Sequence, residues 1–232
     1  MSLSHDLDRI RQQSVDALDD AFDYHQHTKF VWRLMQRAVE DGRLISIQNL
    51  STRTTVDGAE LTRRAQRYAT TYLASATLQQ FVAVFERTWF DLLHRWLKRF
   101  PEQLGSKQVA FRDVLAAADK DTITDMVIDQ KLHNLSYRRL SEWVSAADEM
   151  VGPSLLPEAQ VVRIAEIKAS RDAHVHSNGI AGPQYLDKAG SAARAKRGER
   201  LDISDAYLEQ AWRSIRDAIE HSAGVYCGKA PD

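Results

Sequence analysis

Long stretches of this sequence carry apolar residues at intervals of three and four, with little glycine or proline to interrupt them. The strongest such stretch covers residues 59–99, and its second half is the most apolar part of the chain. Asp57 and Glu60 stand three residues apart at its start, which is the spacing of a capping box at the start of a helix. We expect residues 59–99 to form a long helix that serves as the central strut of the fold.

Further segments show the same periodicity and are predicted to be helices: 5–41, 108–118, 121–134, 136–150, 157–176 and 204–226. The first of them could be one helix or two in line. No run of residues indicates a convincing strand ladder, although part of the polar connector at 43–57 could be extended. We therefore expect an all-α fold, an up-and-down bundle of five or six main helices.

The chain has 232 residues, and a single bundle fits it better than two domains. Residues 1–56 are expected to form an N-terminal helix and connector that pack on the bundle, and residues 57–228 to form the main helical domain. Residues 180–202 are predicted to be a long loop before the last helix. A connection of that length usually carries a function or is disordered.

Composition excludes several classes of protein. Apolar residues make up 44% of the chain, charged residues 27%, and the formal net charge is −1. This balance is typical of an ordinary soluble protein and rules out nucleic-acid binding driven by overall charge. Any nucleic-acid site must then be a local basic patch, assembled by folding or by dimerisation.

Cysteine usage and hydropathy indicate the compartment. Cys227 is the single cysteine, so it can form neither an internal disulfide nor a multi-cysteine zinc site, and a reducing, cytoplasmic setting is expected. Residues 1–20 are polar and acidic, unlike a signal peptide. No apolar run approaches the roughly 18 residues of a membrane span. We expect a cytoplasmic protein that does not associate with a membrane.

The segment SRDAHVHSNGI at residues 170–180 carries the groups best suited to chemistry. Arg171 offers a permanently charged fork that matches the geometry of phosphate, and His176 can exchange a proton near neutral pH. Together such groups can cleave RNA without a metal: the imidazole takes the proton of the ribose 2′-hydroxyl, and the guanidinium stabilises charge on the phosphate. DNA lacks that internal nucleophile. The alternative is a polar helix end, where cations are favourable.

Helical geometry limits how the two residues can cooperate. Positions five apart on a regular α-helix are turned by about 140° from one another, so Arg171 and His176 would not lie side by side. Either the helix ends in a tightened turn, or the site is completed by the same pair from a second molecule. A two-fold homodimer would bring the two patches together and double the local positive charge.

The sequence resembles the HEPN domain family. RDAHVH at 171–176 matches the R-x(4–6)-H motif of that family, and HSNGI at 176–180 is similar to the VHNNGI ending found in abortive-infection and toxin members. Segments 131–144 and 85–101 are similar to the preceding helices, so the resemblance covers about residues 60–226. Ser177 stands where asparagine is commoner.

The resemblance implies a metal-independent endoribonuclease with no cofactor. It further implies an all-α homodimer with facing motifs, in which Arg171 and His176 are the catalytic pair. Asp172, His174 and Asn178 are expected to support them. Such a protein would be a toxin or phage-defence effector with RNA as substrate and an antitoxin or other regulatory protein as a possible partner. The alternative is an inactive HEPN-like scaffold that dimerises or binds RNA or protein.

Several other polar residues require an interpretation. The basic residues of the loop before the last helix could bind RNA phosphates or could simply be solvated: Lys188, Arg194, Lys196, Arg197 and Arg200. His25 and His27 form an H-x-H pair whose rings would leave a helix on different sides, so we expect exposed side chains and no metal site. The tryptophans on apolar stripes are expected in the core: Trp89, Trp96, Trp143 and Trp212.

Overall fold

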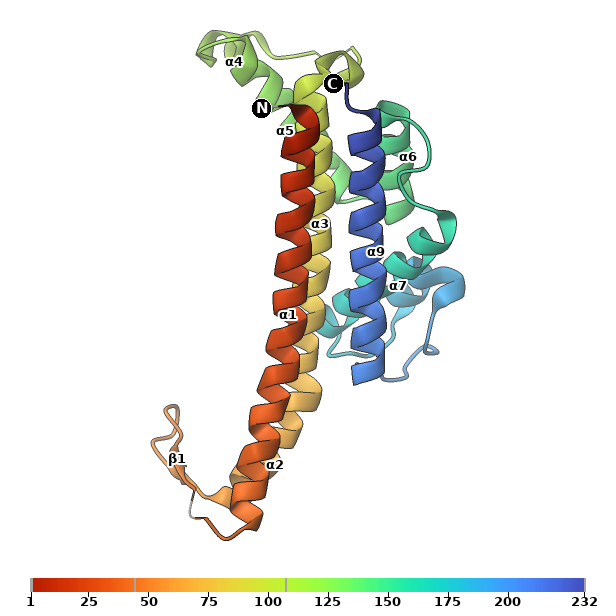
Figure 1. Ribbon diagram of the computed structural model, residues 1–232. Coiled ribbons are helices and arrows are strands. Elements are labelled where there is room, and N and C mark those ends of the chain that lie inside the picture. Colours follow the sequence, from red (N-terminus) through yellow and green to blue (C-terminus); the bar gives the residue numbers. More distant parts are fainter. Residues whose placement is uncertain (1, 44, 107, 232) are drawn as a thin grey trace.

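The computed structural model describes residues 2–43, 45–106 and 108–231. Its framework is three long helices that lie side by side: α1 (Leu3–Glu40), α3 (Ala74–Arg99) and α9 (Asp205–Lys229) (Figure 1). Helix α1 runs against the direction of the other two, and both ends of the chain lie at the same end of the bundle. The all-α prediction is confirmed.

The predicted central strut is present as one continuous helical segment. Helix α2 (Gly58–Arg67) passes through a π-helical stretch, η1 (Tyr68–Leu73), into α3. The side chain of Asp57 caps the start by accepting a hydrogen bond from the Glu60 backbone N–H at 2.9 Å. The capping residue expected from the sequence therefore performs that function.

Shorter helices connect α3 to α9: α4 (Phe111–Ala116), α5 (Lys120–Ser136), α6 (Leu140–Val151), α7 (Glu158–His176) and α8 (Pro183–Ala189), with 3₁₀ turns η2 (Pro101–Leu104) and η3 (Gly190–Ala192). Helices α5 and α7 pack against α3, and α6 and α8 pack against α7, whereas α4 projects from the end of the bundle. The polar connector holds a two-residue antiparallel ladder between β1 (Ile47–Gln48) and β2 (Thr55–Val56), in which Ile47 pairs with Val56 and Gln48 with Thr55. In the described part of the chain, no helix combines the length and apolar character needed to cross a membrane.

The core is centred on α3 and is rich in aromatic residues. Trp89, Trp96 and Trp143 are buried, as the sequence predicts, and Phe90 contacts the Trp143 ring edge-on. Trp212 is half-buried and stacks on Phe22 of α1, with 5.1 Å between ring centroids. A fully buried side chain of this size contributes about 1.5–3 kcal/mol, so the buried face of α3 is a principal source of stability.

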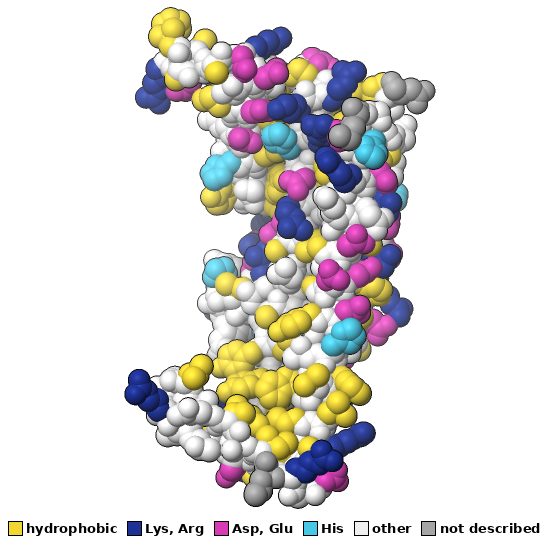
Figure 2. All heavy atoms as spheres, turned by 60° about the vertical axis from the view of Figure 1, so that its left-hand side comes forward, with side chains coloured by type: hydrophobic (Ala, Val, Ile, Leu, Met, Phe, Trp, Pro, Cys, Tyr) yellow, Lys and Arg dark blue, Asp and Glu magenta, His cyan; other side chains and the backbone are white. Residues whose placement is uncertain are grey.

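The end of α1 after Lys29, together with α2 and η1, extends beyond the start of α9 as a helical arm, with the β1–β2 hairpin near its tip (Figure 1). Large apolar side chains stay exposed on α1 and η1 of this arm, among them Phe30, Val31, Leu34 and Tyr72. Figure 2 shows hydrophobic side chains gathered on the arm, below a region of α1 where charged side chains prevail. The arm therefore presents a partly apolar surface to solvent.

Residues 180–202, predicted to be a loop, form a folded cap instead. Pro183 begins α8, and a second apolar cluster joins the end of α7 to this segment: Ala169, Ala173, Ala181, Tyr185, Ala189 and Leu201. Ile180 and Arg200 form an antiparallel bridge, and the Ala181 N–H donates to the Glu199 carbonyl at 2.8 Å. The loop prediction is wrong for residues 183–192, which are helical, because this segment is short and buries only Tyr185 and Ala189, so its hydropathic signal is weak.

The expectation that His25 is exposed was wrong. Its side chain is fully buried where α1, α3 and α9 meet. Nδ1 lies 3.2 Å from the Thr77 hydroxyl and Nε2 lies 3.3 Å from the Asp205 carboxylate, which also pairs with Lys29. Burial lowers the pKa of His25 below its ordinary value, an effect that Asp205 opposes. The neutral imidazole thus provides hydrogen-bond partners for Thr77 and Asp205 where the three helices meet.

The buried His25 predicts a loss of stability in acid. The unfolded chain takes up the proton near pH 6.5, whereas the folded chain resists it. The stabilisation is therefore complete above about pH 6.5 and is lost as the pH falls through the lowered folded pKa. Urea denaturation at pH 7.5 and pH 5.5 should show a drop in the free energy of unfolding that is smaller in His25→Gln. The exposed His27→Gln is the control; an equal drop in both variants would contradict the assignment.

Candidate functional site at the end of helix α7

The cluster identified in the sequence forms the last turns of α7. The helix is regular through His176, and Ser177 at the C-cap donates its N–H to the Ala173 carbonyl at 2.9 Å. Asn178 and Gly179 then adopt positive φ angles of 50° and 75°, and the Gly179 N–H also reaches the Ala173 carbonyl. Asn-Gly ends the helix as predicted, by taking the left-handed conformation that other residues rarely adopt.

Arg171 points from α7 toward α3. Its Nη2 donates to Glu86 Oε1 at 2.7 Å, and its Nε lies 3.2 Å from Asp172 Oδ1. Lys168, one turn earlier, binds the same Glu86 oxygen, and its Nζ lies 4.0 Å from the centre of the Trp143 ring. Burial lowers the pKa of Lys168, and Glu86 opposes the shift. Two cations thus share one carboxylate at the α3–α7 contact.

His176 faces a different environment. It is exposed and lines an open cleft of about 580 Å³ between the end of α7 and α8. The other polar side chains in this cleft come from Asp172, Ser177, Gln184 and Lys188. Asp172 Oδ2 accepts a hydrogen bond from Lys188 Nζ at 2.8 Å. The cleft therefore combines an accessible imidazole, an ammonium group and a carboxylate.

The structure excludes one of the two sequence-based alternatives for the Arg171–His176 pair, a tightened turn at the helix end. Because α7 keeps α-helical geometry through His176, the two side chains leave it at about 140° to one another. The expected tightened turn is not found. Asp172 connects the two regions, since its carboxylate lines the cleft and also approaches Arg171. Within one chain, Arg171 and His176 do not meet.

His174 and Asn178 support the shape of the cap. The His174 Nε2 lies 2.8 Å from the Leu201 carbonyl, and burial lowers the pKa of this imidazole. Gly179 packs so closely on this ring that a Cβ there would lie 2.7 Å from His174 Cε1. Arg200 Nη1 lies 3.4 Å from the Asn178 backbone carbonyl. The predicted supporting residues thus hold the cap beside the cleft, and a direct part in chemistry stays a prediction.

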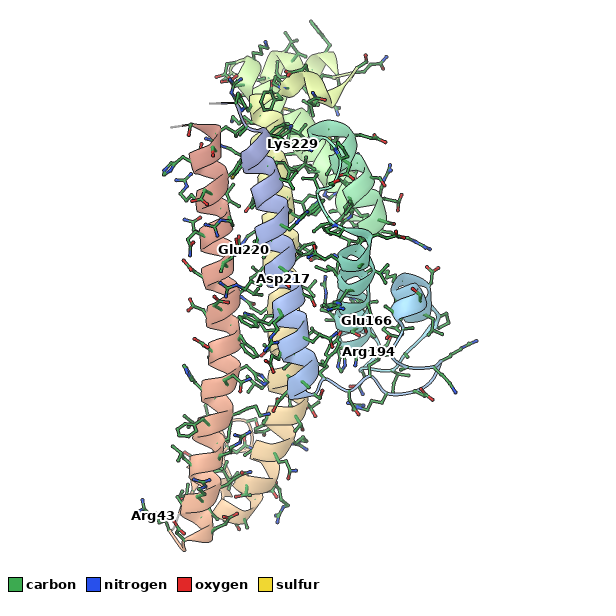
Figure 3. All side chains as sticks on the ribbon, turned by 45° about the vertical axis from the view of Figure 1, so that its right-hand side comes forward. Arg43, Glu166, Arg194, Asp217, Glu220 and Lys229 are labelled. Atoms are coloured by element: carbon green, nitrogen blue, oxygen red, sulfur yellow. The ribbon has the colours of Figure 1, made fainter. Side chains whose placement is uncertain are left out.

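The five basic residues predicted to contact RNA lie in unlike environments. Lys188 borders the cleft through its bond to Asp172. Lys196, Arg197 and Arg200 are exposed on the cap. The Arg194 guanidinium instead points inward, toward Glu166 (Figure 3). The role of these residues in RNA binding stays a prediction. For Arg194 the structure shows an ion pair with the buried Glu166.

Glu166 is the polar residue that the sequence reading overlooked. It is buried, and its carboxylate accepts hydrogen bonds from the following groups: Ser170 Oγ at 2.6 Å, Arg194 Nε at 2.8 Å, Tyr207 OH at 2.9 Å and Tyr185 OH at 3.1 Å. The Arg194 guanidinium also lies 3.6 Å from the centre of the Tyr207 ring. Burial raises the pKa of both tyrosine hydroxyls. The sequence feature that could have indicated this network is the position of Glu166, a carboxylate on the apolar stripe of α7.

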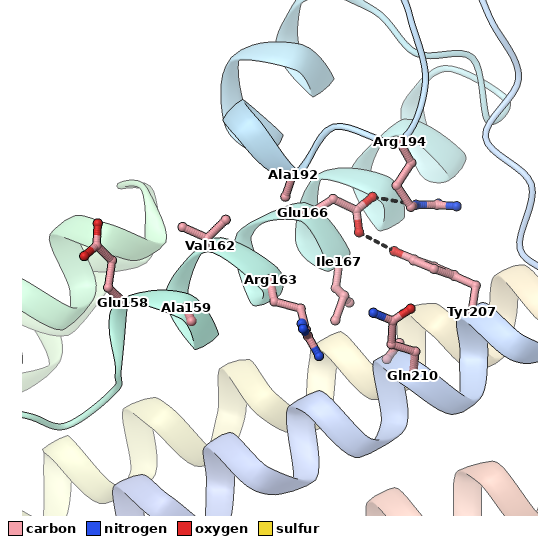
Figure 4. Close-up of a pocket in the computed structure, with 11 residues that line it drawn as sticks. Glu158, Ala159, Val162, Arg163, Glu166, Ile167, Ala192, Arg194, Tyr207 and Gln210 are labelled. Carbon is pink, nitrogen blue, oxygen red and sulfur yellow. Dashed lines mark hydrogen bonds and ion pairs between the residues drawn. The ribbon is translucent and has the colours of Figure 1, made fainter.

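A second cavity, of about 530 Å³, lies beside the Glu166 network (Figure 4). Helices α7 and α9 and the cap line it, and Glu166 contacts Arg194 and Tyr207 at one side of it. Arg163 and Gln210 extend along another part of its wall. Since Arg194 and Glu166 already satisfy one another, we assign this network to holding the cap on the bundle.

Comparisons with family models, with curated proteins and with solved structures find no match for this chain. Within the described ranges, no three histidine, cysteine, aspartate or glutamate side chains gather in a way that could hold a metal ion.

The Glu166 network predicts that Arg194 stabilises the protein. Arg194→Ala leaves the buried carboxylate without its cation and should lower the free energy of unfolding by about 2 kcal/mol, less than for a fully buried pair because the arginine is partly exposed. Arg197→Ala, an exposed position in the same cap, should change it by less than about 0.5 kcal/mol. Urea denaturation measures both. Equal stabilities for the two variants would remove the structural role assigned to Arg194.

Proposed function

We propose that this chain is a metal-independent endoribonuclease of HEPN type. The observation that carries the proposal is the exposed His176 imidazole in an open cleft, with Lys188 and Asp172 beside it and Arg171 on the same helix end. An accessible imidazole supplies the base for a ribose hydroxyl, and the adjacent cations favour a polyanion. The R-x4-H motif suggests this chemistry independently of the cleft.

The reaction follows from the chemistry of these groups. His176 takes the proton of the 2′-hydroxyl, and the 2′-oxygen forms a bond to the adjacent phosphorus as the bond to the 5′-oxygen breaks. An acid protonates the leaving 5′-oxygen, and the products are a 2′,3′-cyclic phosphate and a 5′-hydroxyl. The guanidinium of Arg171 stabilises the charge that builds on the non-bridging oxygens.

Within one chain Arg171 and His176 do not meet, and a second copy of the chain would bring the two side chains together. In a two-fold dimer formed through the ends of α7, Arg171 of one copy can face His176 of the other, and solvent water can protonate the leaving 5′-oxygen. Val175 and Ile180, both exposed and apolar, flank His176 and offer contact area for such a dimer. The proposed active site is therefore composite.

The biological setting follows from the same resemblance. We propose a cytoplasmic toxin or phage-defence effector that acts on RNA and is held in check by an antitoxin or other regulatory protein. Growth arrest on expression that depends on His176 would support this setting, because an inactive protein has no means of arresting growth through RNA cleavage.

One observation favours a second candidate function. Glu86 and Asp172 both lie against Arg171, so two carboxylates neutralise the guanidinium that should bind phosphate. An inactive HEPN-like scaffold, which dimerises or docks a partner without turning over RNA, would retain this arrangement at no cost. Such a scaffold predicts no RNA cleavage by the purified chain.

Removal of the imidazole should abolish cleavage. His176→Ala is expected to lower the rate of RNA cleavage by about 10²–10⁴-fold, the usual contribution of a general base, and to leave the helical circular dichroism signal unchanged. His27→Ala, also exposed but on α1, is the matched control. Cleavage that persists in His176→Ala, or that falls equally in His27→Ala, would refute the assignment.

The composite site predicts complementation between two inactive variants. An equimolar mixture of Arg171→Ala and His176→Ala, refolded together, forms heterodimers that hold one intact site composed of Arg171 from one copy and His176 from the other. With half of the dimers mixed, and one site in two intact, activity should return to about a quarter of wild type. A site built within one chain predicts that the mixture stays inactive.

A further inference from the structure

A single carboxylate oxygen of α3 holds two cations of α7. Glu86 Oε1 accepts from Arg171 Nη2 at 2.7 Å and pairs with the Lys168 ammonium group as well. Lys168 and Arg171 are three residues apart, so they lie on the same face of the helix. The arrangement is an anion site formed by two side chains, and its anion comes from the protein itself.

This anion site is reachable from solvent. The side chains of Lys168, Arg171 and Glu86 are 15%, 24% and 30% exposed, and the glutamate is the most exposed of the three. Rotation of the Glu86 side chain toward solvent would therefore expose both cations without moving a helix. The Trp143 ring supports Lys168 from the bundle side, so the ammonium group would stay in position when the carboxylate leaves.

Lys168 and Arg171 together have more N–H donors than the Glu86 carboxylate accepts hydrogen bonds from. Arg171 Nε is buried and has no hydrogen-bond acceptor among the described residues, because Asp172 Oδ1 lies close but out of line. A guanidinium has five N–H donors and an ammonium group three. A phosphate group presents several oxygens in the geometry that an arginine fork binds, and so fits these donors better than one carboxylate oxygen does.

We propose that Lys168 and Arg171 together bind a phosphodiester of the RNA, and that Glu86 occupies the position of this phosphate in the unliganded chain. On binding, the phosphate replaces the carboxylate between the two cations. Lys168 is thus a further phosphate-binding residue, and Glu86 sets the affinity of the site by competing with RNA. This inference rests on the proposed function for its choice of RNA as the ligand.

The test compares the affinities of charge-matched variants for RNA that cannot be cleaved. A fluorescent single strand of 2′-O-methyl RNA is titrated into wild type, Glu86→Gln and Glu102→Gln, and the dissociation constant is measured by anisotropy. Glu102 is exposed on η2, beyond the far end of α3, and its substitution changes the net charge by the same amount. Glu86→Gln should bind at least about threefold more tightly, the scale of one partly screened charge contact, and Glu102→Gln should match wild type.

A second variant tests the part of Lys168. Adding Lys168→Met to Glu86→Gln should return the affinity to the wild-type value or below, and the salt dependence of binding should become less steep. A purely structural ion pair predicts instead that Glu86→Gln loses thermal stability and binds RNA no more tightly than wild type. That result, or an affinity that Lys168→Met does not change, would overturn the inference.

A third measurement requires no substitution at Glu86. In ¹⁵N-labelled wild type, the Arg171 Nε–H resonance, identified by its loss in Arg171→Lys, should shift on titration with the same RNA; an unmoved resonance at saturation contradicts the inference. Failure of this proposal is distinct from failure of the proposed function. Cleavage that depends on His176, with no effect of Glu86→Gln on affinity, removes only the former, whereas tighter binding by Glu86→Gln without any cleavage removes only the latter.

Discussion

The burial of α3 among the other helices is the constraint on which the rest of the structure depends. This helix packs against α1, α5, α7 and α9, and its apolar face supplies many of the large buried side chains of the core. The same helix carries Glu86 on its border, where the core ends and solvent begins. Packing of α7 against α3 therefore fixes two things at once, the position of the candidate site and the carboxylate that neutralises its arginine.

The folded cap at residues 180–202 forms the second wall of the cleft at the end of α7. Buried Glu166 of α7 accepts hydrogen bonds from Arg194 of the cap and from Tyr207 of α9. His174 of α7 makes a further contact to the cap, at the Leu201 carbonyl. A rigid cap holds Lys188 next to Asp172 and forms the wall of the cleft that His176 lines. The chemistry proposed for the helix end thus depends on a scaffold of buried polar contacts, in which each carboxylate is paired.

Local patterns in the sequence predicted the helices because each long helix buries one stripe of its own residues. Periodicity over 59–99 identified the strut and over 157–176 identified α7, and Asn178–Gly179 marked its end. The cap at 180–202 escaped prediction because α8 is short and the cap buries only four residues, two of which are alanines: Ala181, Tyr185, Ala189 and Leu201. Length and hydropathy carry too little information there.

Local patterns in the sequence could not predict contacts between distant parts of the chain. His25 is buried through a partner 180 residues away, and Arg171 meets Glu86 across 85 residues. The sequence could identify Arg171 and His176 as suitable groups, but it could not reveal that a carboxylate neutralises the first while the second faces an open cleft. Those facts depend on how helices pack, which the periodicity of one helix does not specify.

The chemical form of the cut RNA ends tests the central claim most directly. The purified chain is incubated with a defined single-stranded RNA in EDTA, and the products are identified by mass spectrometry. Attack by the ribose 2′-oxygen predicts 2′,3′-cyclic phosphate and 5′-hydroxyl ends, with no product from the matching DNA strand. Ends that carry a 3′-hydroxyl and a 5′-phosphate, or a complete lack of cleavage, would contradict the account.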